Sequence, residues 1–205
     1  SIKPTSGTQV GPIVFDLETN GLLHDATRIH CAALHWCETG ITESFNDEKY
    51  GDGTFCIKEE APCGASYSIT TFLGWLETAD YLVGHNIIGF DLPIIKRLYP
   101  WFNPRGIVID TLILSRLFHP NLLDIDKYRK EEGHLKHMPL QLYGRHSLES
   151  WGHRLGDYKG NFSKTTDWKE WSQEMEDYCK QDVAVTTKLC NHFHKYLNGF
   201  FLNIR

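Results

Sequence analysis

The sequence predicts an α/β fold in which a mixed five-stranded sheet is flanked by helices. Short apolar runs typical of buried strands recur along the chain, and the first three of them come before any helical pattern. After residue 68, segments with helical spacing alternate with further strands. Strands and helices in this order are typical of a sheet with helices on its faces. No apolar run approaches the roughly 20 residues needed to span a bilayer.

Composition limits the class of protein only broadly. The chain has 205 residues, which suits one domain, and its 41% hydrophobic and 23% charged residues are ordinary for a globular protein. A net charge of −5 is unlike the basic balance of most nucleic-acid binders. A carboxylate cluster that binds divalent cations would lower the formal charge in the same way, so the charge discriminates poorly. None of the six cysteines forms a C-x-x-C pair, and we expect reduced thiols and a cytoplasmic protein.

Turn-forming residues open the chain, so we expect residues 1–11 to be a flexible tail and residues 12–205 to form one domain. Ile13–Phe15 reads as a buried strand, and Arg28–Trp36 and Ile41–Phe45 as two more that close an antiparallel meander. The remaining predicted elements are, in order, a helix from Ser68 to Thr78, a strand at 81–85, a helix at 91–98, a strand at 107–110, a helix at 111–118, a capped short helix beginning at Ser147, and a long helix at 169–197. Residues 119–145 are polar and are expected to form an irregular excursion over the surface.

The first strand ends in two carboxylates that point the same way. Residues two apart in a strand share a face, so Asp16 and Glu18 project together while Leu17 faces the other side. Two such carboxylates raise each other's pKa unless a cation lies between them. Taken alone, the pair is equally typical of exposed acids at a strand end.

Three more residues are candidates for the same site as Asp16 and Glu18. Asp91 follows a buried strand, where open α/β sheets bind ligands, although an aspartate there also suits a helix cap. Tyr178 and Asp182 lie four residues apart in the last helix and therefore on one face, as they would also do in a helix with one core aromatic and one solvated acid. Together, four acids and a tyrosine at the edges of predicted elements favour one shared site.

Phosphodiester hydrolysis needs this combination of side chains. Two divalent ions about 3.5–4 Å apart can activate the attacking water and stabilise the leaving oxygen. Hard cations such as Mg²⁺ prefer oxygen ligands, which carboxylates supply. A phenol with an ordinary pKa near 10 is a poor base at pH 7, so Tyr178 is expected to orient the water more than to take its proton.

At this point the sequence resembles the DEDDy branch of the DnaQ-like 3′→5′ exonucleases. The three exonuclease motifs are matched by Ile-Val-Phe-Asp-Leu-Glu-Thr-Asn-Gly-Leu-Leu at 13–23, His-Asn-Ile-Ile-Gly-Phe-Asp-Leu-Pro at 85–93 and Asp-Tyr-Cys-Lys-Gln-Asp-Val at 177–183. Two connecting stretches, 109–120 and 146–160, are similar to the proofreading domain of family A DNA polymerases from short-tailed coliphages. The similarity covers about residues 12–197.

The resemblance implies an RNase H-like fold, two divalent cations (Mg²⁺ or Mn²⁺) and release of nucleoside 5′-monophosphates. It assigns the metal-ligand role to Asp16, Glu18, Asp91 and Asp182, and the water-orienting role to Tyr178. Asp177 stands where the sister branch has a histidine, which indicates the tyrosine type. It also implies that substrate contacts are made by Thr19, Leu22, Asn86 and Phe90, with Leu22 wedged against the terminal base.

Two further groups of residues invite interpretation. Lys127–Lys130, Lys136, Arg145 and Arg154 form a basic stretch that could contact the phosphates of a single strand, or could simply be a solvated insertion. His192 and His194 lie two apart on a helix and do not face one site, so we expect surface or nucleic-acid-facing histidines. Trp75 and Trp151 are expected in the core, and Trp168 and Trp171 at its rim or in it.

The sequence therefore predicts a metal-dependent 3′→5′ exonuclease that degrades single-stranded or frayed DNA 3′ ends and is linked to proofreading of replication. We expect a phage-type monomer in the bacterial cytoplasm, without membrane contact, that stands alone and serves a separate polymerase; an excised polymerase domain is the alternative. An RNA-trimming exonuclease similar to RNase D is a second hypothesis, which 2′-hydroxyl dependence would reveal. A non-catalytic nucleic-acid-binding or polymerase-docking module is a third, and it would be expected to lack a carboxylate.

Overall fold

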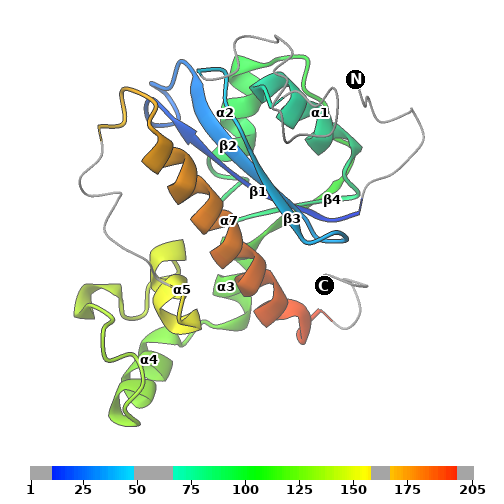
Figure 1. Ribbon diagram of the computed structural model, residues 1–205. Helices are drawn as coiled ribbons and strands as arrows, with labels where there is room; N and C mark the ends of the chain where they lie inside the picture. The colour runs from blue at the N-terminus through cyan, green and yellow to red at the C-terminus, as the bar shows by residue number, and fades with distance from the viewer. Residues whose placement is uncertain (1–10, 49–66, 158–166, 198–205) are drawn as a thin grey trace.

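The computed structural model describes residues 11–48, 67–157 and 167–197, and these contain one mixed five-stranded sheet (Figure 1). The strand order is β3-β2-β1-β4-β5. Nearly all of the predicted tail, most of the loop expected at 156–167, and Cys56 and Cys63 lie outside the described residues. The strands are β1 (Ile13–Thr19), β2 (Ile29–Trp36), β3 (Ile41–Phe45), β4 (Tyr81–Gly84) and β5 (Ile107–Asp110).

The sheet changes from antiparallel to parallel at its central strand. β1 pairs antiparallel with β2, and β2 pairs antiparallel with β3, which confirms the predicted meander. On its other side β1 pairs parallel with β4, and β4 pairs parallel with β5. The carboxyl ends of β1, β4 and β5 therefore meet at one edge of the sheet, where side chains from distant parts of the sequence can meet.

Helices cover both faces of the sheet. Helices α1 (Ile69–Thr78) and α2 (Asp91–Leu98) lie on one face, and α7 (Gln173–His194) runs along the other (Figure 1). Alternate residues of β1 supply the two cores: Phe15 packs with α1, whereas Val14 packs against α7. Ser68 caps α1, with its hydroxyl accepting from the amide of Thr71. The α/β class and the five-stranded mixed sheet are thus confirmed.

A group of shorter helices lies beside one end of α7. These are α3 (Thr111–Phe118), α4 (Leu122–Glu131), the 3₁₀ turn η1 (Leu140–Leu142) and α5 (Leu148–Leu155), of which α4 reaches farthest from the sheet (Figure 1). The prediction of an irregular excursion at 119–145 was therefore wrong. The segment has its own interior, because Leu122 packs with Trp151 and with Phe193 of α7. Trp151 is in the core as predicted, while Trp75 is half-buried against the main core.

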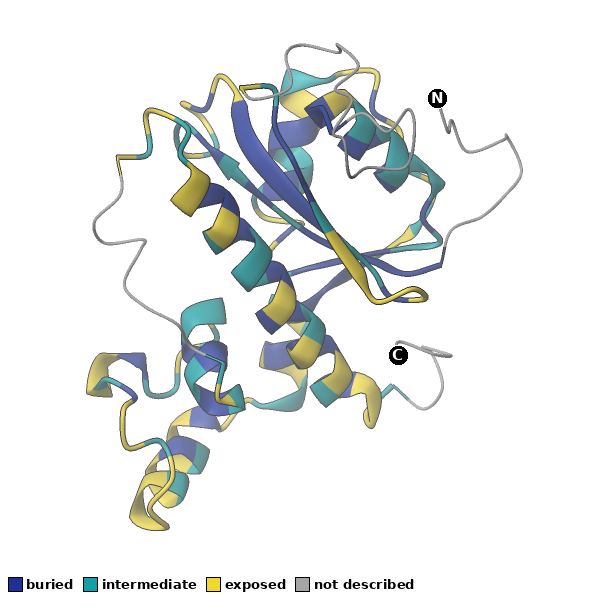
Figure 2. Cartoon of the chain, viewed as in Figure 1, coloured by how far each residue is buried: buried dark blue, intermediate teal, exposed yellow. Residues whose placement is uncertain are grey.

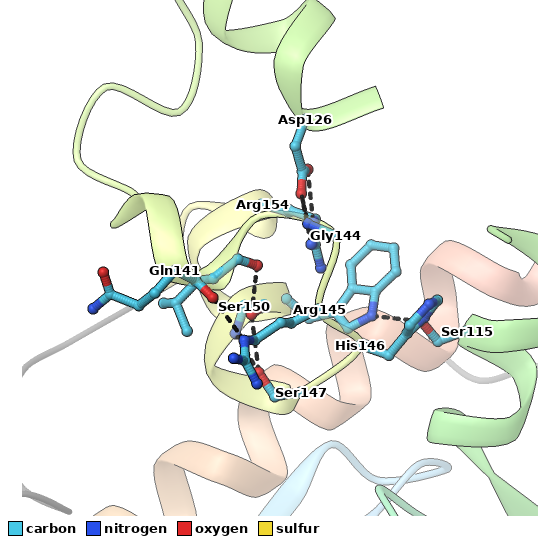
Figure 3. A network of polar contacts seen from close by, with 11 residues as sticks. Ser115, Asp126, Gln141, Gly144, Arg145, His146, Ser147, Ser150 and Arg154 are labelled. Carbon is cyan, nitrogen blue, oxygen red and sulfur yellow. Dashed lines mark hydrogen bonds and ion pairs between the residues drawn. The ribbon is translucent and has the colours of Figure 1, made fainter. Parts of the chain in front are cut away.

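An ion pair in this group of helices corrects another prediction. Arg154, which had been considered for phosphate contact, is buried and donates two hydrogen bonds to the carboxylate of Asp126, at 2.9 and 2.7 Å (Figure 3). The same carboxylate accepts from the amide of Gly144 at 2.8 Å. These bonds join α4, the loop before α5, and α5. The exposed outer surface of α4, in contrast, is visible in Figure 2.

The last helix is shorter than predicted. It begins at Gln173 rather than near Lys169, because the Ser172 hydroxyl accepts from the Met175 amide and caps the first turn. It ends at His194, three residues before the predicted end at 197. Within the described residues, no helix combines the length and apolarity that crossing a membrane requires.

Candidate active site

The exit of β1 places two carboxylates at the edge of a cleft. Asp16 and Glu18 are half-buried on one face of β1, and Leu17 between them is buried in the opposite core. The cleft has a volume of about 250 Å³. It is lined by residues from β1, the loop after β4, the start of α2, the segment before α7, and α7 itself: Asp16, Leu17, Glu18, His85, Asn86, Phe90, Asp91, Trp168, Tyr178 and Asp182.

The loop between β4 and α2 is held by a carboxylate from the neighbouring strand. Asp110, buried at the end of β5, accepts hydrogen bonds from the amides of Asn86, Ile88 and Leu112 at 2.9–3.0 Å. Asn86 has a φ of 65°, a left-handed conformation that asparagine tolerates better than most residues. Gly84 precedes the loop, where a Cβ atom would come within 3.0 Å of the Phe15 carbonyl oxygen and 2.2 Å of Ile87 Cγ2. These contacts fix the backbone that leads to Asp91.

Asp91 is the first residue of α2 and not its cap. Phe90 occupies the cap position and makes no side-chain cap bond, so the helix-cap interpretation of Asp91 was wrong. The Asp91 side chain is instead turned into the protein, with 3% exposure, and its Oδ1 atom has no hydrogen-bond partner. A buried carboxylate oxygen without a partner is unfavourable, and it is a position that a cation would satisfy.

Helix α7 brings the last two side chains to the cleft. Tyr178 and Asp182 lie one turn apart, and the Tyr178 hydroxyl hydrogen-bonds to the Asp182 carboxylate. Two residues before Tyr178, the buried Glu176 accepts from the Ser44 hydroxyl and, at 2.8 Å, from the Asn46 amide group. This contact ties the beginning of α7 to the β3 edge of the sheet and fixes where Tyr178 lies.

The four carboxylates share one electrostatic environment. Burial, and then the negative charges of Glu18, Asp91 and Asp182, raise the pKa of Asp16 well above its ordinary value. Burial and the charges of Asp182 and Asp91 do the same to the pKa of Glu18. Burial raises the pKa of Asp91 and of Asp182 to about 7, although the Tyr178 hydrogen bond opposes the shift of Asp182.

Such a cluster is suited to divalent cations. The charges of Asp91 and Asp182 oppose ionisation of Asp16 and Glu18, and among the described residues no lysine or arginine forms a salt bridge with any of the four acids. All the donors contributed by Asp16, Glu18, Asp91 and Asp182 are hard oxygen atoms, of the kind that Mg²⁺ and Mn²⁺ bind. With the unpartnered Oδ1 of Asp91, these residues fit a metal centre.

The structure brings most of the sequence-predicted site residues together, but not all. Asp16, Glu18, Asp91, Tyr178, Asp182, Asn86 and Phe90 all line the cleft. Within the described chain, Thr19 and Leu22 are not among the lining residues. Thr19 is buried and its hydroxyl donates to the Gly21 carbonyl at 2.7 Å, so that hydroxyl is engaged within its own turn. Leu22 is 74% exposed in the loop that follows β1.

Four residues of the site were not nominated from the sequence. His85 lines the cleft with its Nδ1 atom 2.9 Å from the Thr111 hydroxyl, and burial lowers its pKa to about 4, so its ring is neutral at pH 7. Trp168 was predicted only to lie at the rim of the core or in it. Its ring is edge-on to that of Tyr178, with the two ring centroids 6.4 Å apart. Asp110 and Cys179 touch the site from behind. Cys179 lies within the third exonuclease motif and Asp110 within the connecting stretch 109–120, and those positions were the one signal that could have found them.

The prediction that His192 and His194 are surface residues is met by His194 and only partly by His192. His192 is half-buried, with its Nε2 atom 2.9 Å from that of His119, and both rings pack against Trp151. It is therefore part of an interior aromatic cluster, whereas His194 is exposed.

Comparison with known proteins gives matches at two levels. No family model matches the sequence. The DNA-directed DNA polymerases of Escherichia phage T7 and Enterobacteria phage T3 are 31% and 30% identical over 198 residues, and each match covers 86% of this chain and 26% of the polymerase. The chain thus spans about a quarter of the length of these relatives.

Solved structures share the fold. Brucella melitensis NrnC superposes with a TM-score of 0.58 at 18% identity, over 96% of this chain and 78% of the other. NrnC bound to pGG gives 0.56 at 18% identity, over 95% and 76%, and NrnC with bound Mg²⁺ gives 0.54 at 19% identity, over 95% and 77%. At these identities the likeness establishes the arrangement of helices and strands.

Proposed function

We propose that this chain is a DnaQ-like exonuclease, and specifically a metal-dependent 3′→5′ exodeoxyribonuclease that removes nucleoside 5′-monophosphates from DNA. Its similarity to the DNA polymerases of phages T7 and T3 and the fold that it shares with NrnC support this proposal. One observation carries the proposal. Four carboxylates from three distant segments converge on one cleft, and the Oδ1 atom of Asp91 is buried there without a partner.

Each side chain has a role in this proposal. Asp16, Glu18, Asp91 and Asp182 would hold two divalent cations, Mg²⁺ or Mn²⁺. Bound cations supply the positive charge that phosphodiester hydrolysis requires and promote ionisation of water. Tyr178, which hydrogen-bonds to Asp182, would orient the attacking water. His85 is neutral and borders the same space, so it adds no charge that would compete with the cations.

The substrate contacts are proposed for residues in the cleft and in the loop after β1. Phe90 and Trp168 offer aromatic rings at the cleft, on which a terminal base could stack. The exposed Leu22 would meet the base from the loop after β1. Thr19 would contact the terminal 3′-hydroxyl through its backbone amide, since its side chain is engaged with Gly21.

The similarity to two phage polymerases supports DNA as the substrate and a role linked to replication. Action alongside a DNA polymerase, as a monomer, is part of the proposal. The likeness to NrnC bound to pGG favours a second candidate, hydrolysis of short oligonucleotides or RNA ends. The two candidates differ in whether a 2′-hydroxyl or a short chain is required.

A strand-end-resolved assay tests the proposal. A 5′-labelled DNA strand incubated with Mg²⁺ should shorten one nucleotide at a time, and a 3′-labelled strand should release a labelled mononucleotide at once. Matched RNA strands and dinucleotides run alongside. Faster turnover of RNA or of dinucleotides would favour the second candidate, and no hydrolysis of any strand with Mg²⁺ or Mn²⁺ would refute both.

A matched pair of variants ties the activity to this cleft. Asp182→Asn removes one carboxylate of the cluster, whereas Asp177→Asn removes an exposed carboxylate of the same helix that accepts a hydrogen bond from Gln173. We expect Asp182→Asn to lose at least about 100-fold in kcat, the size of effect seen when one electrostatic contributor is removed from an active site. Asp177→Asn should retain activity. Equal activity of both variants would remove Asp182 from the mechanism.

A further inference from the structure

A buried cysteine lies directly behind the carboxylates. Cys179 follows Tyr178 in α7 and is completely buried against β1. Its Sγ atom lies 3.4 Å from the Asp16 carbonyl oxygen and 3.6 Å from Asp16 Oδ2. Ligand atoms of Asp16, Glu18 and Cys179 all lie within 4.8 Å of one another. We propose that these three residues form a site for a thiophilic divalent cation, such as Zn²⁺ or Cd²⁺, that overlaps the site proposed for Mg²⁺.

The spacing of the donor atoms fits such an ion. A tetrahedral zinc with a Zn–S bond of about 2.3 Å and a Zn–O bond of about 2.0–2.2 Å separates sulfur from oxygen by about 3.5–3.7 Å. The observed separation of Cys179 Sγ and Asp16 Oδ2 is 3.6 Å. The separation of this pair therefore matches that of two ligands of one zinc ion, and Glu18 offers an oxygen within 4.8 Å of both.

A second, independent feature points to a ligand at the same place. Asp91 borders the cleft with Asp16 and Glu18, is 3% exposed, and has an Oδ1 atom with no hydrogen-bond partner. Its negative charge acts directly on both Asp16 and Glu18. The cleft beside Asp16 and Glu18 thus holds a buried carboxylate oxygen that a bound cation would satisfy.

The thiol changes which cation the cleft prefers. Oxygen ligands alone suit Mg²⁺ and Mn²⁺, whereas a thiolate ligand favours zinc and other soft ions. In the metal-free protein the Cys179 thiol donates to Asp16; on binding a soft ion it gives its proton to solvent and the sulfur becomes a ligand. The ion would occupy Asp16 and Glu18, which the proposed magnesium site also uses, so soft cations would exclude Mg²⁺.

Two other buried cysteines serve as controls. Cys31 lies on β2 opposite Glu18, and its thiol contacts that of Cys179, so it is a soft donor immediately behind the proposed site. Cys190 lies farther along α7 in the same core and is not part of the cluster. Replacing each by serine separates the contribution of Cys179 from a general effect of losing a buried thiol.

The test is spectroscopic and independent of hydrolysis. The full chain, reduced and freed of metal, is titrated with Cd²⁺ while the ultraviolet charge-transfer band of a cadmium–thiolate bond is recorded. Mg²⁺ and Zn²⁺ affinities are then measured by calorimetry for the wild type and for Cys179→Ser, Cys31→Ser and Cys190→Ser. Circular dichroism establishes that each variant is folded before its affinities are compared.

We expect one Cd²⁺ ion to bind to each protein chain and to produce the thiolate band. The band should be lost in Cys179→Ser and retained in Cys190→Ser. Zn²⁺ affinity should fall by at least about 10–100-fold in Cys179→Ser, because removing even an outer partner of a metal ligand has an effect of that size. Mg²⁺ affinity should fall by less than Zn²⁺ affinity, because serine keeps a hydrogen-bond donor beside Asp16 and Mg²⁺ does not prefer sulfur ligands.

Three results would overturn the proposal. The wild type could show no thiolate band at one Cd²⁺ per chain, the band could survive in Cys179→Ser, or the band could be lost in Cys31→Ser alone. Because the readout is a sulfur–metal bond, the proposal can fail while the exonuclease activity is established, and it can hold while that activity is refuted.

Discussion

Removing the Asp126 carboxylate should destabilise the helices beside α7 more than removing any exposed charge there. The carboxylate accepts two hydrogen bonds from the Arg154 guanidinium and one from the Gly144 amide (Figure 3). Both side chains of the ion pair are almost inaccessible, with 1% and 0% exposure. Asp126→Ala would therefore leave a buried cation without its anion.

Loss of one partner of a buried ion pair typically costs about 3–5 kcal/mol. In a chain of this size, 1 kcal/mol corresponds to about 2–4 °C in Tm, so Asp126→Ala should lower Tm by about 6–20 °C. Lys127→Ala is the matched control, because Lys127 is the exposed neighbour on the same helix. It should change stability by no more than about 0.5 kcal/mol.

Urea unfolding and thermal unfolding followed by circular dichroism provide the assay. The double variant Asp126→Leu/Arg154→Met adds a second arm, since replacing both charges by apolar groups of similar volume is often close to neutral. We expect it to recover most of the lost stability. If Asp126→Ala proved as stable as Lys127→Ala, the reasoning that the pair is desolvated and holds α4 to α5 would be refuted.

Three further predictions concern the cleft. Tyr178→Phe should lower kcat by about 10–100-fold with little change in Mg²⁺ affinity, because it removes a hydrogen bond of about 1.5–3 kcal/mol. An unchanged kcat in steady-state assays would argue against a role for Tyr178 in orienting the water. Glu176→Ala should destabilise the fold by about 1–3 kcal/mol for each of Ser44 and Asn46 left unpaired, and Glu176→Gln by less; equal urea midpoints for the two variants would contradict this. Mg²⁺ at 100 times its Kd should stabilise the protein by about 2.7 kcal/mol and raise Tm by about 5–11 °C, and EDTA should reverse the increase. A Tm that does not respond to EDTA would count against a metal that binds only the folded state.

The sequence predicted the sheet and the convergence of the acids for a simple physical reason. Strand periodicity puts Asp16 and Glu18 on one face, and helical periodicity puts Tyr178 and Asp182 on one face. Both are local properties that need no knowledge of the fold. The resemblance to a known family then indicated that these faces meet, which is a long-range property.

What the sequence did not predict depends on contacts between distant residues. Helix α4 looked like a polar excursion because its stability comes from Asp126 meeting Arg154, 28 residues away. The same contact removed Arg154 from the basic stretch that had seemed suited to phosphate. His192 likewise looked like a surface histidine until His119 was found against it. Local spacing contains no information about either pairing.

The site shows the same division. Asp91 looked like a helix cap from its neighbours, yet the structure turns its carboxylate inward, and Asp110 from the next strand holds the preceding loop. Cys179 was visible only as one of six thiols until its sulfur was found 3.6 Å from Asp16 Oδ2. The contacts of residues that lie behind a site are determined by tertiary packing, so a sequence motif does not reveal their roles.

The central claim is that carboxylates from β1, α2 and α7 hold divalent cations together. Crystals of the protein soaked in Mn²⁺ and measured at a wavelength where manganese scatters anomalously test it most directly. We predict anomalous peaks within bonding distance of Asp16, with Glu18, Asp91 and Asp182 as the surrounding ligands. Fully occupied manganese elsewhere, with none at this cleft, would contradict the account.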